Sequence, residues 1–351
     1  MASTNITSGF DTRALRELLL TSAAANEGKY LFPKLPFNYR LQDTSLFKGT
    51  VRAIPIAHQF GEGGAVTDGS LIRQAHSQYF DATRARAFDE TSYECLERSA
   101  KVLIDQQEVD DTANVEIAGL RMRESRLLHL TSLVFDAMEY DSCSAIFNTS
   151  NFSNATAALL SGGAGVAWNA AGSSPAKDGI AIQNLLRARG AKADYAVCSF
   201  DVAQSLRIHP ETLNVWYKTS GATNAEPIAD MDFALSLWAK RWGLSKGLYC
   251  VEAMYNSANP ASTASLTEYA SGKIAFHCAD GLSNTYNVGG NITANGQVSL
   301  MCIRTQEPQV LEDVTTDPHG LQFTLKHRFT FHTPYASAAT RPAYIITAVN
   351  G

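Results

Sequence analysis

Charged residues are scarce in this sequence, and neither sign of charge dominates it. Asp, Glu, Lys and Arg make up 18% of the 351 residues, below the roughly 25% usual for soluble domains. The 29 basic and 34 acidic residues leave a formal net charge of -5. Tight binding to nucleic acid generally uses a basic excess, so this balance argues against a protein that grips DNA strongly. A low charge density suits a protein that buries much of its surface against copies of itself.

Long apolar runs and paired cysteines are missing as well. No stretch approaches the roughly 18 apolar residues of a membrane span, so we expect no contact with a membrane. The six cysteines are scattered without a CxxC pair. Four of them lie in apolar, strand-like segments: Cys198, Cys250, Cys278 and Cys302. Buried reduced thiols of a cytoplasmic protein are the favoured interpretation, with disulfides or a zinc site as the alternative.

Motifs of common enzymes are absent too. No GxxxxGK[ST], HExxH or GxSxG occurs, and the glycine runs at 61–64 and 162–165 lack the GxGxxG spacing. His327 and His332 lie five residues apart in a strand-like segment, so they would point to opposite faces. We therefore expect no catalytic residue, no cofactor and no metal. A soluble hydrolase that uses Cys198 as its nucleophile is the alternative.

An apolar segment that contains two prolines occupies residues 30–37. Proline bars a regular helix, so we predict an extended arm with exposed apolar side chains. Such an arm is costly in a monomer and makes sense if a neighbouring subunit covers it. The candidate arm contacts are Phe32, Leu35 and Phe37.

A glycine-rich turn at 61–69 separates two strand-like runs, 46–60 and 71–88. Glycine supplies the positive φ values of turns, so this pattern predicts a long projecting hairpin. Because an isolated two-stranded hairpin is marginal in water, we expect it to rest on another chain. The candidate contacts on the hairpin are Arg73, Tyr79, Arg84 and Arg86.

No proline interrupts residues 113–147, where apolar residues recur at spacings of three, four and seven. The pattern predicts a helix of about 30 residues, about 45 Å long. On its polar face, Arg121, Arg123 and Arg126 are candidates for contact with DNA phosphates. Acidic residues lie among them, so a solvated or inter-subunit helix face is the favoured alternative.

Shorter helices follow. One is predicted to open at Ser174-Pro175 and to end at Gly190. Its expected apolar face consists of Ile180, Ile182, Leu185 and Leu186. A second helix, 201–208, is expected to stop at His209-Pro210. A third spans 230–242, with Asp230 and Asp232 at its start as capping residues and Gly243 at its end.

Strands are predicted where the apolar residues alternate. A short buried strand is expected at 195–198, and period-two alternation predicts others at 273–278, 297–302, 321–332 and 344–349. We find no regular alternation of strands and helices that would indicate βαβ units, and no internal repeat. The sequence therefore indicates an α+β fold with antiparallel strands.

The order of several short motifs is similar to the central signature of tailed-bacteriophage major capsid proteins. The motifs are Trp168-Asn169, Ser174-Pro175, Gly190 to Val197, Val202 to Leu206 and His209-Pro210, continued by segments at 237–243, 247–251, 253–256 and 271–276. Each piece is weak alone, but their order and spacing together are more specific. The specific part covers about 168–279, and the matching order of elements runs over about 30–349.

This resemblance implies the Hong Kong 97-type capsid fold. It assigns an N-terminal arm to 1–44, an extended hairpin called the E-loop with its return to 45–110, and a peripheral domain with a long spine helix to 111–180. An axial domain would occupy about 181–315, and 316–351 would supply return strands of the peripheral domain.

The function implied by the resemblance is a shell subunit that assembles into hexamers and pentamers of an icosahedral head around double-stranded DNA. The protein would be made in the cytoplasm of the host bacterium and reside in the virion capsid. Its partners would be itself, portal, scaffolding and decoration proteins, and packaged DNA by weak non-specific contact. With about 28 residues before the arm, we expect any scaffold to be a separate protein. An encapsulin-like nanocompartment that packages enzymes is the alternative shell.

Overall fold

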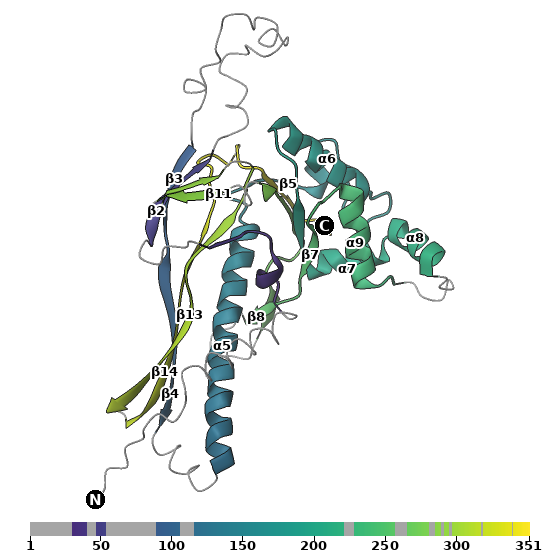
Figure 1. Cartoon of the computed structure of the whole chain (residues 1–351). Coiled ribbons are helices and arrows are strands. Elements are labelled where there is room, and N and C mark those ends of the chain that lie inside the picture. The colour runs from purple at the N-terminus through teal and green to yellow at the C-terminus, as the bar shows by residue number, and fades with distance from the viewer. Residues whose placement is uncertain are drawn as a thin grey trace, which may run out of the picture.

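The structure is a computed structural model that describes residues 30–40, 47–53, 89–105, 116–220, 228–256, 265–280, 285–288, 291–294, 297–316, 319–338 and 340–351. The long helix α5 runs beside the long strands β13, β14 and β4, and a lobe that carries α6, α7, α8 and α9 lies to one side (Figure 1). The described part of the chain contains no helix long and apolar enough to cross a membrane.

The elements are as follows. The helices are α5 (Glu116–Ile146), α6 (Pro175–Ala188), α7 (Phe200–Ile208), α8 (Pro210–Ser220) and α9 (Met231–Trp242), with 3-10 turns η1 (Phe32–Lys34) and η2 (Ala157–Leu159). The strands before α6 are β1 (Asn38–Arg40), β2 (Lys48–Ala53), β3 (Asp89–Glu94), β4 (Leu96–Asp105) and β5 (Ser153–Thr156). The later strands are β6 (Tyr195–Ser199), β7 (Gly247–Val251), β8 (Met254–Asn256), β9 (Leu266–Glu268), β10 (Ile274–His277), β11 (Thr285–Val288), β12 (Asn291–Ala294), β13 (Met301–Thr316), β14 (His319–His332) and β15 (Ala343–Thr347).

Helix α5 has 31 residues, which corresponds to about 46 Å. Leu130, Met138 and Ile146 of this helix are all buried. The predicted long helix within 113–147 is therefore confirmed, and no proline interrupts it.

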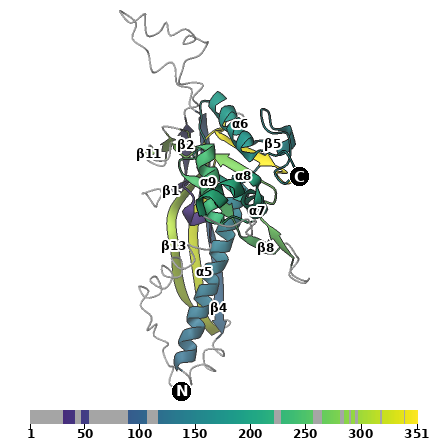
Figure 2. The ribbon, with the colours of Figure 1, turned by 90° about the vertical axis from the view of Figure 1, so that its right-hand side faces the viewer.

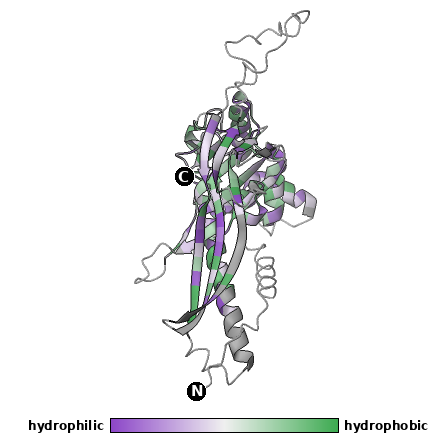
Figure 3. Ribbon diagram, turned by 60° about the vertical axis from the view of Figure 1, so that its left-hand side comes forward, coloured by the Kyte–Doolittle hydropathy of each residue, from purple (hydrophilic) through white to green (hydrophobic). Residues whose placement is uncertain are grey.

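Strand β14 is the centre of a four-stranded sheet with the order β1-β13-β14-β4. It pairs antiparallel with both β13 and β4. Phe323, Leu325 and Phe329 are buried, whereas Lys326 and Arg328 on the opposite face are partly exposed. The bands of hydrophobic and hydrophilic residues along these strands are visible in Figure 3. The strand predicted at 321–332 and its alternation are confirmed.

A five-stranded sheet with the order β5-β15-β10-β6-β7 forms the core of the lobe. It is mixed: β10 is antiparallel to β6 and β15, but β6 runs parallel to β7. Helices α7, α8 and α9 make the crossover between β6 and β7, so the expectation of antiparallel strands without a βαβ unit is wrong here. All five residues of β6 are buried, as is usual for strands covered on both faces in α/β units.

The helix ends in the lobe follow their local signals. Pro175 opens α6, and Gly190 adopts φ +73° after its end. Asp230 accepts a hydrogen bond from the backbone N–H of Phe233, and Gly243 closes α9 with φ +68°. These predictions are confirmed.

Helix α7 stops at His209-Pro210, as predicted, because His209 is its extended C-cap. A further helix that was not predicted, α8, begins at Pro210, so the dipeptide forms an elbow between two helices. Proline is well tolerated at a first helical position, because the amide hydrogen that it lacks has no partner there.

The proline-containing segment near the N-terminus differs from its prediction. Phe32, Leu35 and Phe37 are 2%, 3% and 0% exposed, so the interpretation as an arm with exposed apolar side chains is wrong for them. Phe32 and Phe37 pack their rings against Phe331 of β14, with centroids 6.0 and 5.8 Å away. The prolines bar an α-helix but permit the 3-10 turn η1, which tucks these side chains into the chain's own core.

The predicted hairpin tip lies outside the described residues, and so do Arg73, Tyr79, Arg84 and Arg86. Its two flanks are described: β2 and β3 pair antiparallel from Lys48↔Glu94 to Ala53↔Asp89. Ala53 and Asp89, the last residue of β2 and the first of β3, are therefore partners in this pairing.

Candidate functional site

The motif that carries the capsid resemblance forms the packed core of the lobe. Trp242 lies 5.8 Å from Trp168, 5.4 Å from Trp238 and 5.4 Å from Phe276, measured between ring centroids. All four side chains are buried. Aromatic groups of this size dominate core energetics, so the signature is first of all a folding signature.

Asp178 on α6 ties the loop before this helix to the core. Its fully buried carboxylate accepts hydrogen bonds from Trp168 Nε1 at 2.7 Å and from the backbone N–H of Ala164 at 2.5 Å. The next residue, Gly179, lies directly against Trp242: a Cβ at this position would be 2.1 Å from the indole Cδ1. The sequence around the Ser-Pro helix start is therefore explained by packing around two tryptophans.

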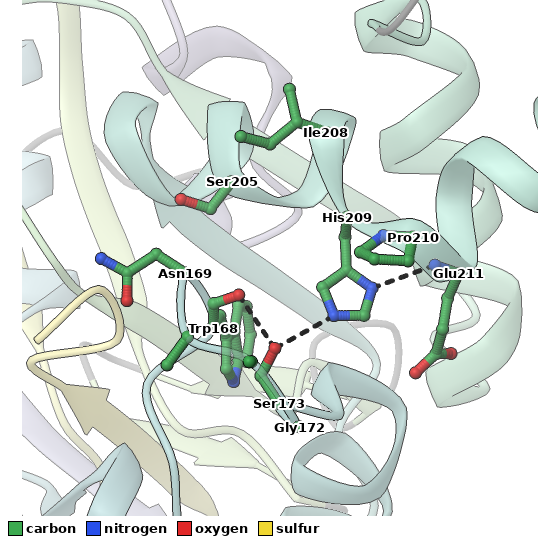
Figure 4. Close-up of a pocket in the computed structure, with 11 residues that line it drawn as sticks. Trp168, Asn169, Gly172, Ser173, Ser205, Ile208, His209, Pro210 and Glu211 are labelled. Atoms are coloured by element: carbon green, nitrogen blue, oxygen red, sulfur yellow. Dashed lines mark hydrogen bonds between the residues drawn. The ribbon is translucent and has the colours of Figure 1, made fainter. Parts of the chain in front are cut away.

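A cavity of about 380 Å³ opens between the loop at 168–173 and the α7–α8 elbow at 205–211 (Figure 4). Ser173 and His209 meet in it, with 3.2 Å between Oγ and Nε2. His209 Nδ1 accepts from the backbone N–H of Glu211 at 3.3 Å, so the proton resides on Nε2 and is donated to Ser173. Ser173 Oγ in turn donates to the carbonyl of Trp168 at 3.0 Å.

This serine–histidine pair is thus arranged for structure. A general base must accept the serine proton through an unprotonated nitrogen, and here His209 Nε2 is the donor. Burial also lowers the pKa of His209. The pair therefore holds the elbow against the loop that precedes α6.

The predicted thiols are confirmed as buried for Cys198, Cys278 and Cys302, while Cys250 is half-buried, and all six cysteines are free. The hydrogen bond with Cys250 and complete burial raise the pKa of Cys198 well above its usual value. A nucleophilic cysteine needs a lowered pKa and access to solvent, so the environment of Cys198 opposes the hydrolase alternative.

The polar face of α5 is only partly described. Arg126 is half-buried, whereas the side chains of Arg121 and Arg123 lie outside the described residues. Their contact with DNA phosphates stays a prediction. No group of His, Cys, Asp and Glu in the described ranges could hold a metal ion.

Sequence reasoning missed the exposed apolar side chains of the lobe. Ile180, expected on the apolar face of α6, is 53% exposed, while Ile182 and Leu186 are fully buried. Ile208 and Ile228, at the end of α7 and just before α9, are 52% and 50% exposed. The i, i+2 spacing of Ile180 and Ile182 was the available signal, because two such residues cannot share one face of a helix.

Comparison with known proteins gives a result at the level of the fold. No protein-family model and no curated protein matches the sequence. A phage-related protein from Bordetella bronchiseptica superposes with a TM-score of 0.59 and 12% identity over 95% of this chain and 97% of that one. A virus-like particle from Pyrococcus furiosus matches with a TM-score of 0.50 and 12% identity, over 95% and 98% of the two chains.

A capsid structure of the cyanophage P-SCSP1u is less similar, with a TM-score of 0.49 and 10% identity over 92% and 89% of the chains. The chain therefore has the α+β fold of the Bordetella phage-related protein and of the Pyrococcus particle. The α+β fold class expected from the sequence is confirmed.

Proposed function

We propose that this chain is the major capsid protein of a tailed bacteriophage and assembles into the hexamers and pentamers of an icosahedral head around double-stranded DNA. The observation that carries the proposal is the match to the Bordetella phage-related protein over 95% of this chain and 97% of the other. A match of nearly equal lengths means that the two chains share one whole architecture and not a single motif.

Within this proposal each part of the molecule has a role. Helix α5 is the spine helix, and β2 and β3 are the base of the E-loop. The peripheral domain is built from 111–180 and the return strands 316–351, and the axial domain occupies about 181–315. The N-terminal arm is assigned to 1–44, of which 30–37 packs on the body of its own chain, and the E-loop with its return is assigned to 45–110.

The physical requirement for such a shell is many weak contacts that are repeated. Each apolar contact contributes roughly 25 cal/mol of stabilising free energy per Å² of buried area. In a closed shell these contributions add up over all copies. Exposed apolar side chains such as Ile180 and Leu159, 53% and 78% exposed, are consistent with surfaces that neighbours cover. The net charge of -5 suits a wall that touches packaged DNA only weakly.

Assembly would take place in the cytoplasm of the host bacterium, and the product would be the virion capsid. Portal, scaffolding and decoration proteins are the further partners of this proposal. A shell that takes up a protein cargo, as an encapsulin-like compartment does, is the competing outcome.

Negative-stain electron microscopy of the purified full chain tests the proposal. We expect closed shells of uniform size, with nuclease-protected DNA in particles from infected or lysogenic cells. Protein cargo without DNA would favour the nanocompartment. A chain that stays a monodisperse monomer at high concentration, with or without a co-expressed scaffold, would contradict both kinds of shell.

A further inference from the structure

Helix α6 presents one outward stripe that contains an apolar residue between two cations. Lys177, Ile180, Asn184 and Arg187 recur at spacings of three, four and three, and all are exposed. The opposite face of α6 is buried against α9 and β15. Ile180 therefore stands out from the body, 53% exposed, with a positive charge on either side along the helix.

A second apolar patch lies at the start of α9. Ile228 is 50% exposed and Ile208 is 52% exposed. The two are held together because the backbone N–H of Ala229 donates to Arg207 O at 3.4 Å and Arg207 Nε donates to Ala229 O at 2.9 Å. Arg207 and Ala229 are the chain neighbours of the two isoleucines, so the backbones of Ile208 and Ile228 lie near one another.

The two patches are at opposite ends of α9. Helix α6 contacts its C-terminal end, where Trp242 Nε1 donates to Pro175 O at 3.0 Å and Gln183 Nε2 donates to Trp242 O at 3.0 Å. Ile228 precedes its N-terminal cap. The 12 residues of α9 span about 18 Å. Figures 1 and 2 both show α6 and α7 on opposite sides of α9.

The charges around the two patches are complementary. Exposed Lys177 and Arg187 flank Ile180, and the nearest described carboxylate on the helix, Asp178, is buried. At the other end, Asp230 and Asp232 are exposed beside Ile228. The cations there are Arg207, whose guanidinium is bonded to Ala229 O and Gln204 Oε1, and exposed Lys218 on the last turn of α8.

We propose that these patches are the two halves of one head-to-tail contact between neighbouring copies of the chain. Ile180 of one copy packs on Ile208 and Ile228 of the next, and Lys177 and Arg187 face the carboxylates of Asp230 and Asp232. The inference rests on the proposed function, because a contact between two different faces closes into a ring when copies are related by rotation. It names the faces that hold the ring together.

Cysteine cross-linking tests the contact directly. In particles of the Ile180→Cys/Ile228→Cys double variant, mild oxidation should link neighbouring copies into a ladder of dimers, trimers and larger rings on a non-reducing gel. Neither single variant should give the ladder. If the α6 helices of two copies faced each other instead, the Ile180→Cys variant alone would form cross-linked dimers. The matched control pairs Ile180→Cys with Leu311→Cys, which lies exposed on β13, and should stay unlinked.

A charge exchange provides the second readout. Lys177→Glu and Asp232→Lys should each lower the fraction of chain in particles about tenfold, and the two together should restore most of it. Circular dichroism controls for folding. Particles that form without a ladder, or single variants that assemble normally, overturn this contact and leave the proposed function standing. If the wild-type chain stays monomeric under all conditions, both this contact and the proposed function are contradicted.

Discussion

Glu139 on α5 holds Phe32 in place through its buried carboxylate. Glu139 Oε2 accepts the backbone N–H of Phe32 at 2.8 Å, and Oε1 accepts that of Leu31 at 3.1 Å. Glu139 is 1% exposed. Burial raises the pKa of its carboxyl, and the two backbone N–H donors act in the opposite direction. The segment at 30–37 is thus fastened to the body of its own chain by polar as well as apolar contacts.

Replacement of Glu139 by alanine should therefore destabilise the fold. Two buried N–H groups lose their acceptor, at a cost of about 2–5 kcal/mol in total. Urea denaturation followed by tryptophan fluorescence measures the loss. Tyr140→Ala, on the exposed side of the same turn, is the matched control and should cost less. Equal stability of the Glu139→Ala variant and wild type would show that the segment is not docked on α5.

His277 should make the fold sensitive to acid. Burial lowers the pKa of His277 to about 4, against about 6.5 in an unfolded chain. Between these values the unfolded state binds more protons than the folded state, so stability falls as pH falls from 6.5 to 4. The loss from this residue is about 3 kcal/mol.

The measurement is denaturation at a series of pH values for wild type and for His277→Gln. Because the variant has no titrating group at this position, its stability should depend less on pH below 6.5. His327 and His332 have pKa values lowered in the same direction, to about 3 and 4, so a residual slope is expected in both proteins. Identical slopes would contradict the prediction.

Gly179→Ala should destabilise the lobe although alanine usually favours helices by about 1 kcal/mol over glycine. The new Cβ would lie 2.1 Å from the ring of Trp242, and this overlap should cost about 2–3 kcal/mol or more. Thermal denaturation monitored by tryptophan fluorescence is the measurement. Asn184→Ala, on the exposed face of α6, controls for propensity and should be neutral or slightly stabilising. A stabilised Gly179→Ala variant would refute the close packing.

Thiol labelling should separate the cysteines by burial. With an aromatic disulfide reagent at neutral pH, half-buried Cys250 should react first, while Cys198, Cys278 and Cys302 should react only as the chain unfolds. A Cys250→Ala variant identifies the fast thiol. Rapid labelling of Cys198 in the folded protein would revive the hydrolase alternative.

Local signals in the sequence determined the main secondary structure. The proline-free run produced α5, Asp230 and Gly243 set the two ends of α9, and the alternation in 321–332 produced β14. These features depend on caps, backbone freedom and side-chain period, all of which lie within a few residues. The resemblance to capsid proteins rested on the same local features, placed in the right order.

Tertiary structure alone decided which apolar side chains are covered. Phe32 was expected outside and lies in the core, whereas Ile180 was expected inside and stands on the surface. The parallel pairing of β6 with β7 likewise depends on residues 52 positions apart, such as Tyr195 and Gly247. Whether a side chain is buried is set by the distant segments that pack on it, and no local period contains that information.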